Sequence, residues 1–196
     1  METKLQQFLI DDLFIFYIEY RDYEIEIVPD DSSQSPNDWG NDDHFLVYDH
    51  KDLYIEKEGF DPNKIFFDWY HEEGELFHQK TYEGYWVFGV DAYIHGGVHL
   101  ALRGSSKAAM LPDRRWDVSF KGFYLVKRQK GTWTEDEARV LAEGMIESWN
   151  QYLSGDVWGY NIPDLNESCW GYYGQEQCIE DAKNIIDHVQ SELLHV

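Results

Sequence analysis

Apolar residues recur at steps of three and four between Thr134 and Leu153, which places them on one stripe of a helix. The stripe consists of Ala138, Leu141, Ala142, Met145, Trp149 and Leu153. Thr134 and Glu137 have the spacing of a capping box, in which each side chain satisfies an exposed amide at the helix start. Ser154 and Gly155 supply a helix end, and Val157 to Tyr160 has the aromatic and β-branched character of a strand. This stretch therefore predicts a helix that packs on a core and is followed at once by a strand.

The same helical spacing returns near the end of the chain, from Gln175 to Leu194. Its apolar stripe consists of Cys178, Ile179, Ala182, Ile185, Ile186, Val189 and Leu193. A shorter helix is predicted to begin at Asp61 and Pro62, because aspartate caps helices and proline suits their first position. We expect this shorter helix to end near Gly74.

Alternating or β-branched stretches predict strands in the rest of the chain. In Glu24 to Val28 the alternation places Ile25 and Ile27 on one face and both glutamates on the other. The other predicted strands are Leu13–Tyr20, Phe45–Tyr48, Leu53–Ile55, Tyr85–Tyr93, Val98–Leu102, Phe120–Lys127 and, as a strand or turn, Ser168–Tyr173. Strands followed by helix, strand and helix predict an α+β fold, with a mostly antiparallel sheet and two main C-terminal helices packed on one face.

A length of 196 residues favours a single α+β domain over residues 1–196. The polar run from Pro29 to His44 predicts a mobile acidic loop, and Arg103 to Arg115 a basic loop. The sequence contains no run of 18 apolar residues. Asp11 and Asp12 interrupt the N-terminal apolar patch where a signal peptide would be cleaved. We therefore expect a cytoplasmic protein that does not contact a membrane.

The net charge of −22 is the feature with the clearest bearing on function. It is uneven, since residues 1–80 carry −15, residues 81–130 carry +4 and residues 131–196 carry −11. B-DNA with 22 charges is roughly 37 Å long, and a compact chain of this length is about 42 Å across. An acidic side of the protein could thus replace DNA in a basic channel. The alternatives are a bland acidic domain with carboxylates spread evenly, and salt adaptation.

The sequence contains one candidate metal site, but the spacing of its three ligands does not match a metal-binding motif. Asp91, His95 and His99 share a strand face, but a four-residue step separates ligands by about 13 Å unless the Gly-Gly turn brings them together. His71 and Glu72 lack the second histidine that a zincin helix needs. We expect turn or packing roles for these residues, and no metal or other cofactor.

The two cysteines, Cys169 and Cys178, are too few for a disulfide framework, and we expect both to be buried and free. A nucleophilic Cys169 is disfavoured because Glu167 and Glu176 oppose the negative thiolate. The GxSxG, GxxxxGK[ST] and GxGxxG motifs are missing from the sequence. A non-enzymatic protein is therefore predicted, with a small metal-dependent or cysteine enzyme as the alternative.

Aromatic residues are frequent near the C-terminal helices, and there they favour core packing over base stacking. They are Trp149, Tyr152, Trp158, Tyr160, Trp170, Tyr172 and Tyr173. A nucleic-acid binder with this net charge would repel phosphates. Lys107, Arg114 and Arg115 form a basic cluster, which we interpret as a solvated loop or a partner contact.

Three segments resemble an uncharacterised family of small proteins from phages and mobile elements: Tyr93 to Leu102, Arg115 to Val126 and Leu141 to Tyr160. The resemblance covers about the second half of the chain. It implies no particular activity, and where the family has a serine in the histidine-glycine turn this chain has Gly96. A phage setting favours a host-directed inhibitor, for example an acidic decoy of restriction or CRISPR machinery.

The prediction is an acidic phage-type inhibitor in the cytoplasm of the host cell. It would bind the basic nucleic-acid-binding site of a host defence complex by DNA mimicry, as an anti-CRISPR or anti-restriction protein, without binding nucleic acid itself. The predicted partner-binding residues are Asp30, Asp31, Asp42, Asp43, Glu72, Glu73 and Glu75.

Overall fold

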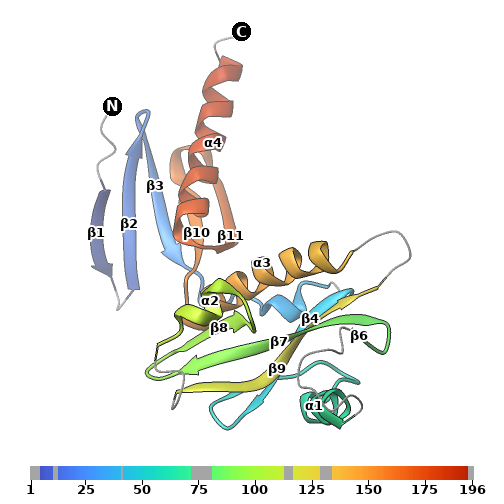
Figure 1. The fold of residues 1–196 in the computed structure, drawn as a ribbon. Coiled ribbons are helices and arrows are strands. Elements are labelled where there is room, and N and C mark those ends of the chain that lie inside the picture. Colours follow the sequence, from blue (N-terminus) through green and yellow to red (C-terminus); the bar gives the residue numbers. More distant parts are fainter. Residues whose placement is uncertain are drawn as a thin grey trace. The chain divides into compact units, whose positions relative to one another are not determined.

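The computed structural model describes residues 5–10, 13–40, 42–71, 81–112, 117–128 and 134–193 (Figure 1). The chain divides into two compact units: unit 1 comprises Met1–Gln34 and Gly155–Val196, and unit 2 comprises Ser35–Ser154. The sequence predicted one domain and did not anticipate this division. The units separate because the first three strands pair with C-terminal elements and not with the sheet that follows them in the chain.

Unit 1 contains a five-stranded sheet in the order β1-β2-β3-β10-β11, with every neighbouring pair antiparallel. Its elements are β1 (Leu5–Ile10), β2 (Leu13–Tyr20), β3 (Tyr23–Pro29), β10 (Val157–Ile162), the 3-10 helix η2 (Pro163–Leu165), β11 (Glu167–Tyr173) and α4 (Gln175–Leu193). The sequence predicted β2, β3, β10, β11 and α4 to within a few residues and missed β1.

The core of unit 1 lies between this sheet and α4. It consists of Ile18, Ile25, Ile27, Tyr160, Ile162, Cys178, Ala182 and Ile186, with Leu165 of η2 packed against it. The predicted alternation of β3 is confirmed, because Ile25 and Ile27 are fully buried on the face that meets α4. Tyr20 of β2 donates a hydrogen bond to Asp187 of α4 at 3.2 Å, and Arg21 forms an ion pair with the same carboxylate at 3.1 Å.

Unit 2 contains a six-stranded antiparallel sheet in the order β5-β4-β9-β7-β6, with β8 paired to β7. Its elements are the 3-10 helix η1 (Pro36–Asp38), β4 (His44–His50), β5 (Leu53–Ile55), α1 (Pro62–His71), β6 (Thr81–Tyr82), β7 (Tyr85–Ile94), β8 (Val98–Leu102), α2 (Ser106–Met110), β9 (Val118–Lys127) and α3 (Glu135–Ser154). The short helix α2 lies within the stretch predicted as a basic loop. It is capped by Ser105, whose hydroxyl accepts from the amide of Ala108 at 3.1 Å.

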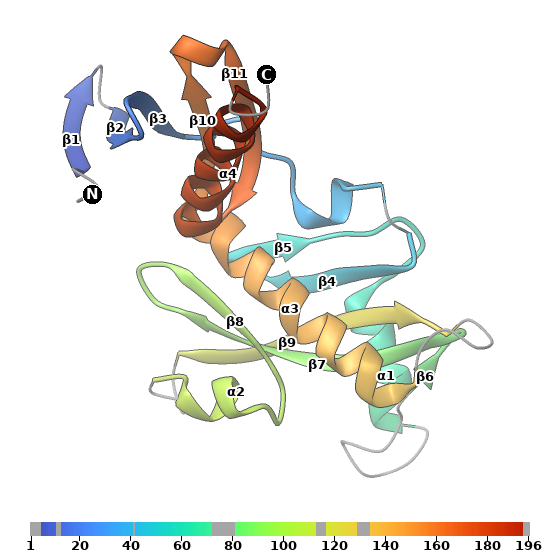
Figure 2. The ribbon, with the colours of Figure 1, turned by 90° about the horizontal axis from the view of Figure 1, so that it is seen from above.

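Helix α3 lies across one face of this sheet (Figure 2). The capping box is confirmed: the Glu137 carboxylate accepts from the Thr134 amide at 2.8 Å, and the Thr134 hydroxyl accepts from the Glu137 amide at 3.3 Å. Gly155 follows the helix at φ 73°, the left-handed conformation that glycine adopts without penalty. Ala138, Ala142 and Trp149 are buried as predicted.

The same helix buries a polar residue, Asn150. Its side chain accepts from the Leu100 amide at 2.7 Å and donates to the Leu100 carbonyl at 3.0 Å. Leu100 belongs to β8, which pairs with β7 on one side. Asn150 therefore gives this edge strand the two hydrogen bonds that a further strand would supply.

The opposite face of the six-stranded sheet packs against α1 (Figure 1). The buried residues there are Phe45, Val47, Ile65, Val87, Phe123 and Leu125. The α+β class with antiparallel sheets is confirmed, and α3 and α4 cover faces of two different sheets. Among the helices of the described ranges, none is long and apolar enough to cross a membrane.

Candidate functional site

A groove of about 1120 Å³ lies in unit 2 between η1, the β4–β5 hairpin and the turn that leads into α1. Its walls carry six carboxylates and two ammonium groups, from Asp38, Asp42, Asp49, Glu56, Glu58, Asp61, Lys57 and Lys64. Four aromatic residues also line it, namely Phe45, Tyr54, Phe60 and Tyr85. The groove therefore combines a negative rim with aromatic surface.

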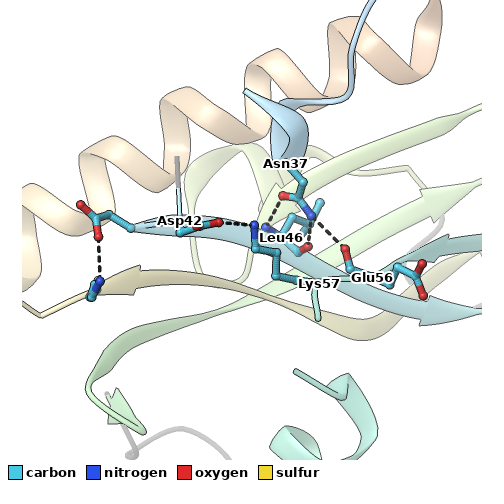
Figure 3. A network of polar contacts seen from close by, with 7 residues as sticks. Asn37, Asp42, Leu46, Glu56 and Lys57 are labelled. Atoms are coloured by element: carbon cyan, nitrogen blue, oxygen red, sulfur yellow. Dashed lines mark hydrogen bonds and ion pairs between the residues drawn. The ribbon is translucent and has the colours of Figure 1, made fainter. Parts of the chain in front are cut away.

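One wall of the groove is held in place by a buried amide, Asn37 (Figure 3). Its Nδ2 donates to the carbonyls of Leu46 at 2.8 Å and Glu56 at 3.2 Å, and its Oδ1 accepts from the Leu46 amide at 3.0 Å. These bonds fasten η1 to the β4–β5 hairpin. The predicted mobile loop over residues 29–44 thus contains a short helix anchored by a fully bonded side chain.

Three of the aromatic residues at the groove form a packed cluster, in which Phe45 is buried. The Phe45 ring lies 4.6 Å from Phe60 and 5.5 Å from Tyr85, and Phe60 lies 5.3 Å from Tyr85, all between ring centroids. Tyr54 lies on the rim and is 65% exposed. Such rings attract cations to their faces as well as apolar groups.

The end of the groove near α1 is shaped by Asp61. Its side chain accepts from the Asn63 amide at 2.9 Å, and its carbonyl accepts from the Ile65 amide at 3.0 Å, so the predicted helix start is confirmed. Asn63 also donates to the Asp49 carboxylate. These two carboxylates therefore help to fix the groove, and Glu56 and Glu58 project from exposed positions.

Two lysines pair with aspartates at or beside the groove, Lys57 with Asp42 of its rim and Lys127 with the neighbouring Asp43. Lys57 lies 2.6 Å from Asp42, and this hydrogen bond lowers the pKa of the Asp42 carboxyl below its usual value. Lys127 lies 3.0 Å from Asp43, whose hydrogen bond raises the pKa of the lysine. Asp42 is exposed, and Lys127 and Asp43 are each about half exposed, so each pair stabilises the fold only weakly. They reduce the negative charge at two of the predicted contact residues.

The predicted partner-binding residues divide between the units. Asp30 and Asp31 belong to unit 1, at the end of β3, where the Asp30 carboxylate accepts from the Ser32 amide at 3.0 Å. Asp42 lines the groove of unit 2 and Asp43 is next to it in the chain. Glu72, Glu73 and Glu75 lie outside the described residues.

Sequence reasoning did not find the remaining groove residues. The acidic Glu56 and Glu58 and the exposed Tyr54 lie within ten residues of the predicted start of α1, and their clustering was a usable signal. The partners of Asn37 are backbone groups 9 and 19 residues away. No local pattern indicates such a residue.

The candidates for catalysis are not assembled into a site. Asp91 is buried and lies 3.6 Å from Arg103, whereas His95 is exposed and 3.8 Å from Asp117. Within the described ranges no three His, Cys, Asp or Glu residues are placed to hold a metal ion. Cys178 is buried, which raises the pKa of its thiol to about 12. The prediction that Cys169 is buried is wrong, since its edge strand β11 leaves it exposed.

No protein-family model, curated protein or solved structure matches this chain. A function cannot be transferred from a relative on that basis. The charge and the aromatic residues of the groove define the chemistry of a suitable ligand.

Proposed function

We propose that this protein is a non-enzymatic acidic inhibitor of phage type, which binds the basic nucleic-acid-binding site of a host defence complex. The observation that carries this proposal is the groove of unit 2, whose lining combines six carboxylates and two ammonium groups with four aromatic residues. A recess of this composition attracts cations and repels phosphates. Its ligand is therefore a set of basic side chains on a protein.

Lysine and arginine side chains suit both components of the groove. Their charged ends bind to carboxylates such as Glu56 and Glu58, and their cationic heads pack on aromatic faces such as that of Tyr54. Proteins that bind nucleic acid display such side chains in rows on the binding surface, spaced to contact successive phosphates. A partner of this class matches the groove in charge and in chemistry.

The charge of the whole chain supports the same class of partner. A net charge of −22 speeds the encounter with a basic surface and makes the rate fall as salt is added. Three segments resemble phage and mobile-element proteins. This resemblance favours a restriction or CRISPR complex as the partner that carries such a basic surface. The mode of action would be DNA mimicry, in which the inhibitor occupies the channel that binds DNA.

The test is a charge reversal in the groove, Glu56→Lys with Glu58→Lys, assayed against restriction and CRISPR nuclease complexes purified from the host. The wild-type protein is expected to displace duplex DNA from one such complex, less effectively as salt rises. The variant should lose at least about tenfold in affinity, because two attractive contacts become repulsive. Measurements of DNA binding by fluorescence anisotropy give both values.

The matched control is Glu176→Lys with Glu180→Lys, which makes the same charge change at exposed positions of α4 in unit 1. This control should stay within about twofold of the wild type at moderate salt. Equal loss in both variants would mean that net charge acts without the groove. Unchanged inhibition in the groove variant would overturn the proposal.

A further inference from the structure

The five-stranded sheet of unit 1 has a second face that α4 does not cover. In the described part of unit 1, α4 and η2 both pack on the face of Ile25 and Ile27. Alternation places another set of side chains on the opposite face: Ile15, Tyr17, Glu19, Glu24, Glu26, Val28, Asn161 and Trp170. We call this set the open face.

Trp170 forms a flat platform on the open face. An ideal Cβ built on Gly159 would lie 2.2 Å from Cε3 of Trp170, so the indole ring rests directly on the backbone of β10. The register between β10 and β11 shifts at this point, and Gly171 adopts φ 82°. This bulge redirects the side chain. Trp170 remains 52% exposed, which leaves indole surface in contact with solvent.

Carboxylates extend across the strands beside this platform. Glu19 of β2 and Glu24 of β3 are direct cross-strand partners, an arrangement that destabilises a sheet when both are charged. Among the described residues no lysine, arginine or histidine forms an ion pair with either. Glu26 is the cross-strand partner of Asn161, whose amide donates to it at 2.7 Å. The described residues of unit 1 therefore leave the charge of Glu19 and Glu24 without a cationic partner on the open face.

The geometry points to a function for the open face: we propose that it binds an arginine-bearing, basic segment of a protein. Strands about 4.8 Å apart place Asn161 one strand and Glu26 two strands from Trp170, within the reach of neighbouring residues of an extended peptide. A guanidinium stacks on an indole and forms paired bonds with a carboxylate, and a lysine ammonium does so less well. Nucleic acid is excluded because the carboxylates repel phosphates.

Charge complementarity identifies this occupant. Unit 1 has 17 Asp and Glu against 3 Lys and Arg, a net charge of −14 in 76 residues. A second copy of the chain would bring the same charge and be repelled. The open face does not depend on the groove, which belongs to the other unit.

The test uses two peptides of equal length, an Arg-Gly repeat and a Lys-Gly repeat, titrated into the full chain. The indole N–H resonance of Trp170, assigned by loss of the signal in Trp170→Phe, should shift with the Arg-Gly peptide. The Arg-Gly peptide should bind at least about threefold more tightly than the Lys-Gly peptide. Trp170→Ala should weaken Arg-Gly binding by about fivefold and abolish this preference.

Matched controls separate the platform from general charge and general exposure. Phe14→Ala removes a ring of equal exposure, 51%, which alternation places on the other face of β2. Glu176→Gln with Glu180→Gln removes charge from α4, in comparison with Glu24→Gln and Glu26→Gln on the open face. Only the open-face changes should weaken Arg-Gly binding, and far-UV circular dichroism verifies that each variant is folded.

Gly159→Ala keeps every charge and displaces the indole from the backbone, so it should also abolish the arginine preference. Equal binding of both peptides to the wild type, or full binding to Trp170→Ala, would overturn the inference. Loss of Arg-Gly binding in the groove variant Glu56→Lys with Glu58→Lys, with Trp170→Ala unaffected, would place the peptide in the groove. That result would refute the open face as a site and leave the proposed function standing.

Discussion

The two units use their acidic residues in different ways. Unit 2 carries a net charge of −8 in 120 residues and pairs several carboxylates with lysine, at Asp42 with Lys57, Asp43 with Lys127 and Glu147 with Lys107. Unit 1 carries −14 in 76 residues and sets Glu19 directly opposite Glu24. The denser charge therefore lies on the unit in which fewer cations are available to offset it.

Net charge alone therefore does not locate an acidic surface. In unit 2, six of the carboxylates lie around a groove together with aromatic side chains. In unit 1, strand alternation aligns Glu19, Glu24 and Glu26 on one face of a sheet. The two surfaces can be tested separately, since each unit has its own core.

The strongest contrast that we predict is in the reactivity of the two thiols, both of which belong to unit 1. At about pH 8 a disulfide reagent should label exposed Cys169 at once and buried Cys178 at least about 100-fold more slowly, because a thiol with a pKa of about 12 is almost entirely protonated. Release of thionitrobenzoate measures both rates, and Cys169→Ser isolates the slow thiol. Equal rates would show that the core of unit 1 is open.

The same labelling tests whether the units are independent. Unit 2 contains no cysteine, so in increasing urea the labelling of Cys178 reports the opening of unit 1. If the cores are separate, its midpoint should differ from that of the total far-UV circular dichroism. Coincident midpoints would mean that the two units unfold in a single cooperative transition and have no separate stabilities.

A smaller effect is expected from adding one methyl group in each unit. An ideal Cβ at Gly122 would lie 2.0 Å from the ring of Tyr48, which is fully buried and donates to the Ser119 carbonyl at 2.7 Å. Gly122→Ala should therefore lower the free energy of unfolding by about 2–3 kcal/mol, as overpacked cores do. Urea denaturation measures it.

Gly159→Ala in unit 1 is the matched change, because Trp170 can rotate into solvent. It should cost less than about 1 kcal/mol of the free energy of unfolding. A cost equal to that of Gly122→Ala would mean that Trp170 is held as rigidly as Tyr48. The platform would then be a structural element of the sheet.

The smallest effect is a pH dependence specific to unit 2. Burial lowers the pKa of His44 below 6.5 and outweighs the opposing charge of Asp43. The unfolded chain binds this proton more readily, so the contribution of His44 to stability is present above pH 6.5 and is lost as pH falls towards the folded-state pKa. His44→Gln should therefore lose less stability between about pH 7.5 and about pH 5.5 than the wild type. Identical slopes in urea unfolding would contradict this.

Local patterns predicted the elements that depend on neighbouring residues. The capping box at Thr134 and Glu137, the glycine after α3 and the alternation of β3 all follow from contacts within a few positions. The amides of Asn37 and Asn150 were missed because their partners lie on other elements, in the second case 50 residues away. Both looked like ordinary polar residues of a loop and a helix.

The two proposed binding surfaces were predictable only in part. Asp42 was selected from its acidic surroundings and does line the groove, but its pairing with Lys57 depends on a turn that sequence does not reveal. Trp170 was assigned to the core because it lies among aromatic residues. Its exposure results from a bulge in β11, and no periodicity signals a bulge.

Unit 1 is assembled from both ends of the chain, since β3 pairs with β10 although all of unit 2 lies between them in the sequence. During synthesis on a ribosome, β3 emerges long before β10. The edge of β3 that pairs with β10 therefore stays unpaired until β10 is made. Unit 2 can complete its own sheet in that interval, because all of its strands are contiguous. Glu24 and Glu26 of β3 carry charge during this interval, and charged side chains on an unpaired strand disfavour its association with other nascent chains.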